Sequence, residues 1–528
     1  MNHKNLLLTL GFVLVQYSVT GVAAAADLAK IRSDGINYLN TLRSDTGMIE
    51  FSTEEHLDTS SYNHAHYQML NNAIGHGESS DNDGYTGSSP AERAVYADYL
   101  HRRVTESISN GQDTVQESID GLFASIYHRF GFLSFDYDEI GIGADFSDSH
   151  AYGNAYVYDI GVSQLRVLCA GESSTADHYY YNVCADEEFR IEASEYENAV
   201  AENANANPAY VLWPYDGQND TLPVFFEESP DPLPDCSVSG YPVSIQFNPQ
   251  KSGTITLTSF KLYDESSNSE VTNTTLLDKD SDPNDILTEY EFALFPMERL
   301  PWDTRYRAEL TYQEDGTDKK IIWKYATKPA PYPYYRILEK DSTFDIKSGQ
   351  TYLLYLPPES CSDTMKQYSI SYSSDLTIEY SFYDYNTIKL TATGSSGTVN
   401  VSPDNGRDFS LTIADSDTAI YPDDSKESTP ESGQISQDFN GDGKSDILFK
   451  QDNGAYNIWL MSKDGKIGTT FVMGDRGWNA EGVGDFNGDG KSDILFKQDN
   501  GAYNIWLMSK DGKIGTTFVM GDRGWSAQ

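Results

Sequence analysis

The sequence has few basic residues, few cysteines and, beyond its first residues, no long apolar run. Lys and Arg together number 37 against 81 Asp and Glu, which gives a formal net charge of −44. A field of this sign repels nucleic acid and anionic lipid, so the sequence predicts no nucleic-acid partner. The same charge favours solubility and the binding of divalent cations.

The long apolar run lies at the N-terminus. Lys4 precedes the apolar residues from Leu6 to Val15, and small residues follow from Ala23 to Ala26. This layout is typical of a secretory signal peptide. The alternative is a membrane anchor, but the run is shorter than the roughly 20 residues that span a bilayer. We therefore predict a signal peptide at 1–26, no transmembrane span, and a mature protein that is secreted or displayed at the cell surface.

Four cysteines fit an oxidising compartment, and four cysteines allow three pairings. Cys169 and Cys184 flank one short segment, and we expect a disulfide to close it as a loop. Cys236 and Cys361 would then pair over a longer distance and tie two domains together. The alternative is four unpaired thiols.

Composition changes along the chain and indicates several domains. Residues 27–165 carry helical signals, whereas residues from about 232 to 418 alternate in the manner of antiparallel β-sandwiches. The predicted segments are a first domain with a β-rich extension (27–230), two immunoglobulin-like β-sandwiches (231–330 and 331–418), an acidic linker (419–437) and a tail (438–528).

The tail is a repeat, because residues 438–478 recur unchanged as 485–525. Each copy begins D-x-N-x-D-G-x-x-D, a set of hard oxygen ligands around a glycine turn that suits Ca²⁺. The predicted calcium ligands are Asp438, Asn440, Asp442, Asp446 and the Lys444 carbonyl, and then Asp485, Asn487, Asp489, Asp493 and the Lys491 carbonyl. The EF-hand is excluded, because its bidentate Glu is replaced by Phe449 or Phe496. The alternative is an Asp- and Gly-rich hairpin turn without metal.

These copies resemble the FG-GAP/VCBS repeats of bacterial surface proteins, including the strand "IWLM" that follows the turn. The resemblance implies a β-repeat module built like propeller blades. A closed propeller needs about four to eight blades. Two copies therefore predict either a small two-unit module or self-association with another chain.

Two helix starts are visible upstream. In "SSPAERAVY", Ser89 is the expected N-cap and Pro90 the first helical residue. Asp113 followed by Gln116 predicts a second helix with a continuous apolar face from Val115 to Ile126, ending at Gly131. His128 would lie in its last turn, and Arg129 would hold a nearby acid or helix end. Strands are expected only after Ile140.

The stretches "YLNTLR", "NHAHY", "GHGES…YTGSSPAER", "TES", "YHRFGFLS" and "EIGIG" resemble, in this order, the bacterial form of the CAP superfamily. That superfamily comprises the cysteine-rich secretory, antigen 5 and pathogenesis-related-1 proteins. The resemblance implies an α-β-α sandwich with a cleft whose histidines and acids can hold a divalent metal such as Zn²⁺. It assigns those roles to His76, Glu106 and His128. Thr105 and Ser107 depart from the Gly-Glu-Asn pattern, and neither Glu117 nor Asp120 has the offset of the second family glutamate.

Three interpretations of His76, Glu106 and His128 remain open: a metal-binding cleft, a hydrogen-bonded network that stabilises the cleft, and a hydrolytic site. No nucleophile motif such as G-x-S-x-G or H-E-x-x-H is present. His64, His66 and His101 are interpreted as ordinary helix residues. We therefore expect an extracellular binding or adhesion protein, with a lipid, peptide or polysaccharide as ligand. The alternative is a metal-dependent hydrolase of peptide or ester bonds.

Overall fold

The structure is a computed structural model. Between residues 28 and 422 it describes 28–226, 228–360 and 363–422. Of the tail it describes residue 439 and residues 446–450, 456–461, 467–473, 478–484, 491–498, 503–508 and 514–520. The predicted signal peptide and most of the predicted linker lie outside these residues. In the part described, no helix combines the length and the apolar character needed to cross a membrane. The chain forms two compact units, residues 1–424 and 425–528.

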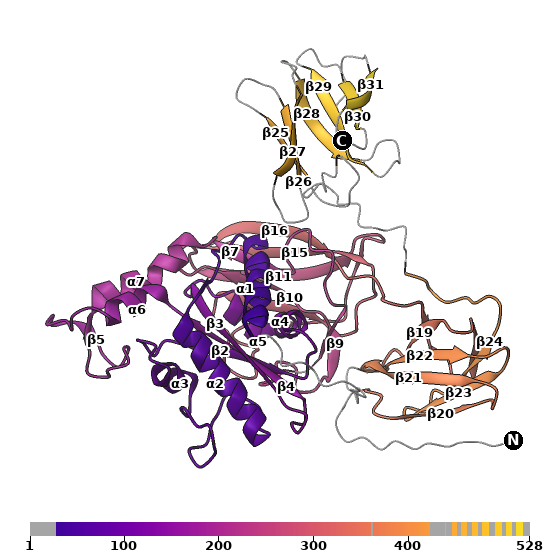
Figure 1. Cartoon of the computed structure of the whole chain (residues 1–528), viewed down its shortest axis with the longest axis horizontal. Coiled ribbons are helices and arrows are strands. Elements are labelled where there is room, and N and C mark those ends of the chain that lie inside the picture. The colour runs from indigo at the N-terminus through magenta and orange to yellow at the C-terminus, as the bar shows by residue number, and fades with distance from the viewer. Residues whose placement is uncertain are drawn as a thin grey trace. The chain divides into compact units, whose positions relative to one another are not determined.

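Most of the helices of the first unit surround its first sheet (Figure 1). The helices are α1 (Leu28–Asp45), α2 (Glu55–Asn71), α3 (Pro90–Tyr96), α4 (Val115–Ala124), α5 (Ile126–Phe132), α6 (Ser163–Cys169) and α7 (Ala193–Ala206). The first sheet has the order β1 (Ser52–Thr53), β3 (Glu139–Phe146), β4 (Asn154–Gly161) and β2 (Thr105–Asn110). Two of these strands precede Ile140, so the expectation that strands begin only after that residue was wrong.

Helices cover both faces of this sheet. On one face α2 packs against the backbone of β3: a Cβ on Gly141 would lie 2.0 Å from the carbonyl carbon of Leu57, so only glycine permits this approach. On the other face, Gly35 of α1 brings that helix against Ile142 and against Val115 of α4. The three layers form the α-β-α arrangement that the resemblance implied.

The helix predicted from Asp113 to Gly131 is two helices. The capping box uses Thr114 and Glu117, not Asp113 and Gln116. Ser125 is extended, with φ −81° and ψ 123°, and separates α4 from α5. The apolar periodicity continues across this break, which is why the sequence indicated one helix. Tertiary contacts that stabilise both new helix ends, described below, account for the interruption.

The segment from α6 to α7 follows β4 and carries the small sheet of β5 (Tyr179–Tyr180) and β6 (Ile191–Glu192). The predicted Cys169–Cys184 disulfide is present and joins the end of α6 to the following loop. Cys236 is disulfide-bonded as well. Its expected partner, Cys361, lies outside the described residues, so that pairing stays a prediction.

Two pairs of sheets follow, and the second pair encloses a cluster of apolar side chains of its own. The first pair consists of two sheets. One has the strand order β13 (Thr274–Leu277), β14 (Glu291–Pro296), β10 (Val243–Phe247) and β7 (Tyr210–Trp213). The other has the order β12 (Ser269–Glu270), β11 (Ile255–Asp264), β15 (Arg305–Glu314) and β16 (Thr317–Ala326). The second pair also consists of two sheets. One has the strand order β17 (Tyr334–Arg336), β19 (Thr351–Tyr355), β22 (Thr387–Thr393) and β21 (Thr377–Asp384). The other has the order β18 (Ser342–Ile346), β24 (Phe409–Ile413), β23 (Thr398–Pro403) and β20 (Tyr368–Tyr372). A short ribbon of β8 (Val224–Phe226) and β9 (Val238–Gly240) accompanies the first pair. The immunoglobulin-like classification of these layers stays a prediction.

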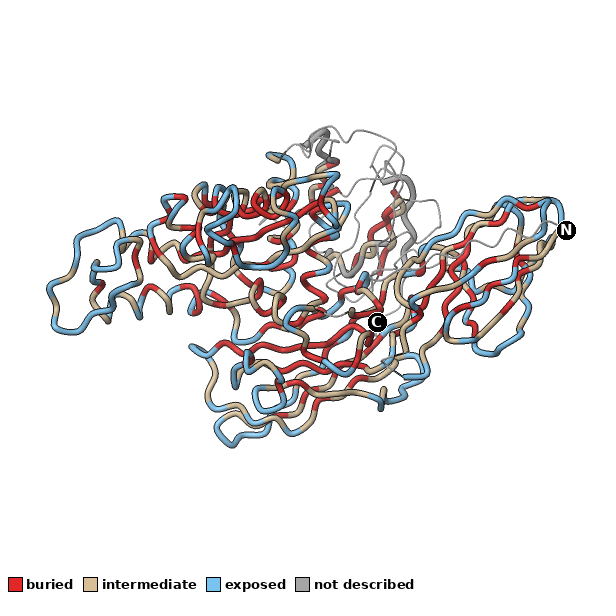
Figure 2. The backbone as a smooth tube through the Cα atoms, turned by 90° about the horizontal axis from the view of Figure 1, so that it is seen from below, coloured by how far each residue is buried: buried red, intermediate tan, exposed pale blue. Residues whose placement is uncertain are grey.

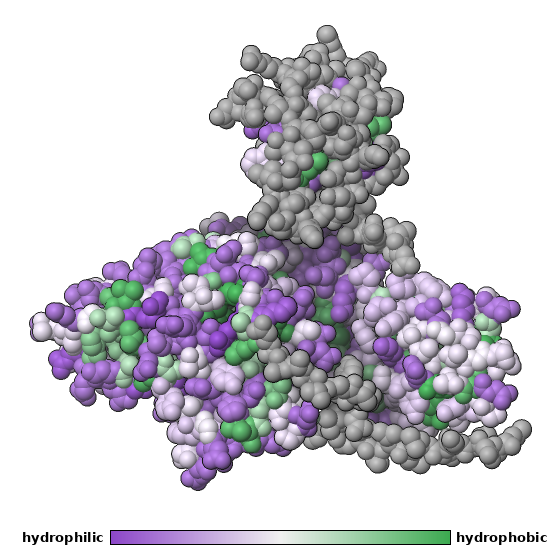
Figure 3. Space-filling model, viewed as in Figure 1, coloured by the Kyte–Doolittle hydropathy of each residue, from purple (hydrophilic) through white to green (hydrophobic). Residues whose placement is uncertain are grey.

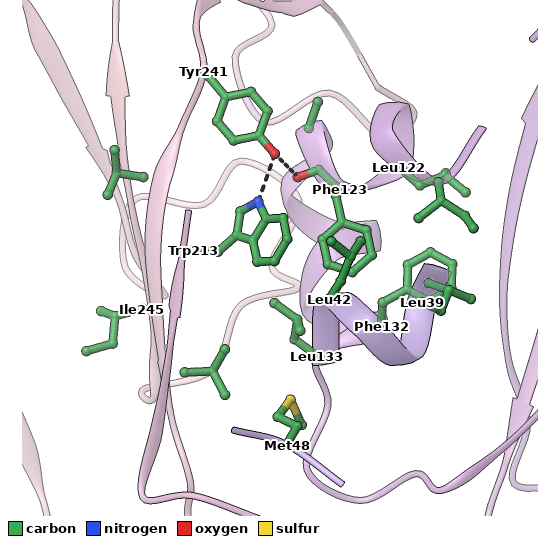
Figure 4. Close-up of a cluster of buried hydrophobic side chains, with 14 of the residues drawn as sticks. Leu39, Leu42, Met48, Leu122, Phe123, Phe132, Leu133, Trp213, Tyr241 and Ile245 are labelled. Atoms are coloured by element: carbon green, nitrogen blue, oxygen red, sulfur yellow. Dashed lines mark hydrogen bonds between the residues drawn. The ribbon is translucent and has the colours of Figure 1, made fainter. Parts of the chain in front are cut away.

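The first pair of sheets shares its core with the α-β-α layers. One cluster of buried side chains runs from Leu39 and Phe123 through Trp213 and Ile245 to Trp323. Figure 4 shows Trp213 beside Phe123, where the indole N–H donates to Tyr241 Oη at 2.8 Å and that hydroxyl donates to the Phe123 carbonyl at 3.0 Å. Strand β7 lies within the predicted 27–230 domain, yet it pairs with β10 of the next predicted domain, 231–330.

The burial pattern of the first unit matches this arrangement. Figure 2 shows buried backbone along the inner strands and helices, with exposed residues concentrated in the connections. Figure 3 shows hydrophilic residues over much of the described surface, with small apolar clusters between them. Such a surface agrees with the large excess of acidic residues.

The described residues of the tail unit form two antiparallel sheets, each built mainly from one copy of the repeat, and the second sheet also includes a strand from the stretch that joins the copies. The sheets are β25 (Ile447–Lys450), β26 (Tyr456–Met461), β27 (Ile467–Met473) and then β28 (Trp478–Gly484), β29 (Asp493–Gln498), β30 (Tyr503–Met508), β31 (Ile514–Met520). Described apolar side chains of both copies share one core. The propeller-blade form stays a prediction.

Candidate functional site

His76 and Glu106 lie in hydrogen-bond contact. Glu106 is on β2, and His76 is in the loop after α2, where Asn72 ends the helix in a left-handed conformation with φ 48°. The His76 Nδ1–H donates to Glu106 Oε1 at 2.8 Å. The imidazole is 48% exposed, whereas the carboxylate is 1% exposed. The His76 side chain is therefore about half exposed while the carboxylate that holds it is buried.

Arg93 provides most of that support. It lies on α3, whose predicted start is confirmed: the Ser89 hydroxyl accepts from the Glu92 N–H, and Pro90 is the first helical residue. The fully buried guanidinium donates from Nη2 to both oxygens of Glu106, at 2.7 Å each, and from Nη1 to the His76 carbonyl at 2.9 Å. Arg93 thus fixes the carboxylate and the histidine loop together.

Burial by itself would raise the pKa of Glu106. The hydrogen bond from His76 and the neighbouring His64 and Arg93 outweigh that effect and hold the pKa of Glu106 below its ordinary value. The carboxylate is therefore ionised at neutral pH. Both of its oxygens are already hydrogen-bonded, so its chemical role here is to orient His76.

A second buried pair holds the loop from behind. His64 on α2 donates from Nδ1 to Glu78 Oε1 at 2.8 Å, and neither side chain is exposed. The other oxygen of Glu78 accepts from the backbone N–H groups of Thr86 and Gly87, at 2.7 and 3.3 Å. From the sequence, His64 was interpreted as an ordinary helix residue. In the structure it helps to position the loop that carries His76, because it holds Glu78.

Asp159 on β4 is a second carboxyl group beneath the site. It is directly opposite Glu106 in the antiparallel pairing of β2 and β4, so both side chains lie on the face covered by α2. Asp159 is fully buried, and its oxygens face Ser60 and Glu106 without forming a hydrogen bond of good geometry to either. Burial, together with the charge of Glu106, raises the pKa of Asp159 well above its ordinary value. The pKa values of the two paired carboxyl groups are therefore moved in opposite directions, so Asp159 keeps its proton to a higher pH than Glu106 does.

His128 has a different carboxylate partner. Its Nδ1–H donates to Glu228 Oε2 at 3.0 Å, and the other oxygen of Glu228 accepts from the Ile126 N–H at 2.6 Å. Glu228 thereby stabilises the first turn of α5. The side chains of His128 and Glu228 are 14% and 2% exposed, so this second histidine is largely covered.

Arg129, beside His128, occupies the break between the two helices. Its buried guanidinium donates to the carbonyls of Phe123 and Ala124 at the end of α4, and to the Pro242 carbonyl and the Ser244 hydroxyl of the adjoining sheet. The predicted helix-end contact is therefore present. Arg129 also ties α5 to the first pair of sheets.

The two histidines predicted as Zn²⁺ ligands bond different carboxylates: His76 donates to Glu106, and His128 donates to Glu228. Within the described residues, no group of three or more His, Cys, Asp or Glu side chains is arranged to hold a metal ion. Glu106 orients His76 and has both oxygens occupied by Arg93 and His76. Zn²⁺ binding by His76, Glu106 and His128 stays a prediction, and no chemical step is assigned to the ion.

The structure describes only part of the predicted calcium ligands of the tail. Asp446 is 4% exposed and accepts from the Phe439 N–H at 2.9 Å, and Asp493 is fully buried and accepts from the Met508 N–H at 2.8 Å. The remaining ligands, except Lys491, lie outside the described residues: Asp438, Asn440, Asp442, Lys444, Asp485, Asn487 and Asp489. Calcium binding stays a prediction.

The α-β-α layers coincide with a stretch that matches a known family. Residues 36–160 match the cysteine-rich secretory protein family. Residues 438–496 match the FG-GAP-like repeat. The chain therefore carries a CAP domain and an FG-GAP-like repeat, and both resemblances drawn from the sequence are confirmed. Together these two domains suggest an extracellular or surface protein.

Two solved bacterial structures resemble part of the chain. An outer surface protein of Borrelia burgdorferi is 16% identical with a TM-score of 0.23, over 26% of this chain and 98% of that one. An extracellular protein with an SCP domain from Bacillus anthracis is 15% identical with a TM-score of 0.22, over 27% of this chain and 44% of that one. At these values neither likeness carries an argument about function. Among curated proteins, none matches the chain.

Proposed function

We propose that the chain is an extracellular or cell-surface binding protein whose CAP domain contacts its ligand at His76. The observation that carries this proposal is the exposed imidazole of His76 held from below by the buried Glu106 and Arg93. Rigid support of one accessible polar group is what specific recognition requires. The ligand classes that we propose are lipid, peptide and polysaccharide, and the excess of acidic groups favours uncharged or cationic members of each.

Binding of the mature chain to arrays of lipids, peptides and polysaccharides tests this proposal. His76→Ala should lower the affinity for the captured ligand by at least about tenfold, roughly the loss of one buried polar contact. His66→Ala is the matched control, because His66 is 45% exposed and also bonds a carboxylate, Asp145, through Nδ1 at 2.8 Å. Equal losses in both variants, or no binding on any array, would contradict the proposal.

A second candidate function is hydrolysis, and the Glu106–Asp159 pair favours it. Neighbouring carboxyl groups with pKa values moved in opposite directions are found at acid–base sites. His76 would then exchange a proton with bound water while Glu106 stabilises the imidazolium. Release of product from peptide and chromogenic ester libraries by the mature chain tests it. Hydrolysis that survives His76→Ala unchanged would assign the activity to another site or to a contaminant.

We further propose that the tail binds Ca²⁺ at the two Asp-rich turns. Support comes from the ligand spacing and from the equivalent placement of the buried Asp446, immediately before β25, and Asp493, the first residue of β29. In this role the ion offsets the mutual repulsion of carboxylates within one turn and stabilises the folded tail.

A further inference from the structure

The segment between α6 and α7 presents aromatic side chains to solvent. In Figure 1 it projects from the α-β-α layers beside these two helices. Register pairs Tyr180 with Ile191 across the small sheet of β5 and β6. Side chains alternate between the two faces of a strand, so Tyr179 and Tyr181 share the face opposite to Ile191, which is 2% exposed. Tyr179 is 36% exposed and Tyr181 is 67% exposed.

These two tyrosines are presented by a fixed support. The disulfide described above closes the segment. The Arg102 N–H donates to the Val183 carbonyl at 2.7 Å and ties the segment to the chain before β2. On the inner face, the ring of Tyr180 packs against that of Tyr196 on α7, with centroids 4.4 Å apart. Little ordering of the outer face would therefore be needed when a ligand binds to it.

A guanidinium already lies on the outer face. The Arg190 Cζ is 4.4 Å from the centroid of the Tyr179 ring. The rings of Tyr179 and Tyr181 meet edge to face, with centroids 6.5 Å apart. The negative face of an aromatic ring attracts a cation, and the planar guanidinium of arginine stacks on it in a way that the ammonium of lysine does not. The outer face thus has the chemistry that holds arginine side chains.

Negative charge is concentrated around the same face. Residues 170–206 contain nine acidic residues and one basic residue, Arg190, which gives a net charge of −8. At the average of the whole chain, a stretch of this length would carry about −3. Eight of the acids are exposed: Glu172, Asp177, Asp186, Glu187, Glu188, Glu195, Glu197 and Glu202. In the part of the chain that the structure describes, Glu187 is the one of these eight that forms an ion pair, with Arg102.

We propose that the outer face of β5, with Tyr179 and Tyr181, binds an extended segment of another protein that carries arginine side chains. The rings take guanidinium groups in the way that Tyr179 takes that of Arg190. The surrounding carboxylates supply the complementary charge and speed the encounter. Binding here does not depend on ligand binding at His76, which lies in the loop after α2.

Two synthetic peptides of equal length and charge test this proposal on the mature full-length chain. One carries Arg at every cationic position and the other carries Lys, and fluorescence anisotropy gives both dissociation constants. The overall charge of the chain attracts both peptides alike, so the ratio of the two constants measures the contact with the rings. The native chain should bind the Arg peptide at least about threefold more tightly than the Lys peptide.

Variants locate the contact. Tyr179→Ala combined with Tyr181→Ala removes both exposed rings and leaves every charge in place, so this double variant should bind the two peptides equally. Tyr152→Ala is the matched control, because Tyr152 is 44% exposed and lies between β3 and β4, and it should keep the preference. Arg190→Gln should strengthen binding of the Arg peptide by about threefold, because it removes the cation that competes for the Tyr179 ring.

Equal affinities of the native chain for the two peptides would overturn the proposal. A preference for Arg that survives the double variant would do the same, since the rings would then not be the contact. Loss of the preference in Tyr152→Ala, or weaker binding of the Arg peptide by Arg190→Gln, would also contradict the assignment of guanidinium binding to the outer face of β5.

Discussion

The buried Asp159 makes the stability of the first unit depend on pH in a predictable direction. Folding raises the pKa of this carboxyl well above its ordinary value, so between the unfolded-state and the folded-state pKa the folded state binds a proton that the unfolded state has released. Its contribution to stability is complete below the unfolded-state pKa of about 3.9 and is lost as pH rises toward the folded-state pKa. Asp159→Asn removes this titration while keeping the shape of a protonated carboxyl and a donor toward Glu106.

The size of the effect follows from linkage. One proton of difference changes the free energy of unfolding by about 1.4 kcal/mol per pH unit. Above pH 5 the native chain should therefore lose stability relative to Asp159→Asn at about that rate, until the folded-state pKa is reached. Glu106 acts in another window. Its pKa is lowered, so its contribution is present above the unfolded-state pKa of about 4.3 and is lost only at lower pH.

Calorimetry of both proteins from pH 5 to pH 8 measures the difference. This range spans about three pH units and lies above the ordinary pKa of Asp. Buried acids that do not interact with Asp159 titrate in both proteins and cancel in the comparison. The exposed Asp148→Asn serves as the control and should leave the pH dependence of the native chain unchanged. Parallel stability curves for the native chain and Asp159→Asn would refute the reasoning, because they would show that Asp159 titrates alike in the folded and unfolded states.

Three further outcomes are expected. Replacing Cys169 and Cys184 by Ser should lower the free energy of unfolding by about 3 kcal/mol for a separation of 15 residues, and limited proteolysis should then cut the intervening segment faster. Arg129→Met should cost about 3 kcal/mol in a denaturant titration, because carbonyls at the end of α4 and in the adjoining sheet lose their donor. Chelation by EDTA should lower the melting temperature of the tail, and millimolar Ca²⁺ should restore it. Identical melting curves would falsify the calcium ligands.

Local signals in the sequence were reliable where one short stretch determines the structure. Ser89 and Pro90 predicted the start of α3, and the spacing of Cys169 and Cys184 predicted their disulfide. Apolar periodicity failed at Ser125, because the ends of α4 and α5 are stabilised by distant groups. Glu228 lies about a hundred residues from His128 and had no local pattern to indicate it.

Asp159 did carry a signal that was overlooked. It is the acid within the otherwise apolar or small stretch "YVYDIG" of a buried strand, and such a residue needs a special environment. Its pairing with Glu106 depends on the register of β2 and β4, which no single stretch encodes. The chemistry at His76 was thus visible in the sequence, whereas the carboxyl beneath it required the sheet.

Because the α-β-α layers and the first pair of sheets share one core, they must be inherited or exchanged together. A recombination event that moved residues 36–160 alone would expose the inner side chains around Phe123 and leave Trp213 without its neighbours. The stretch that matches the family is therefore shorter than the stretch that must be inherited together to keep this core intact. In a lineage of such chains, loss of the first pair of sheets should be accompanied by replacement of the apolar residues on α4 and α5.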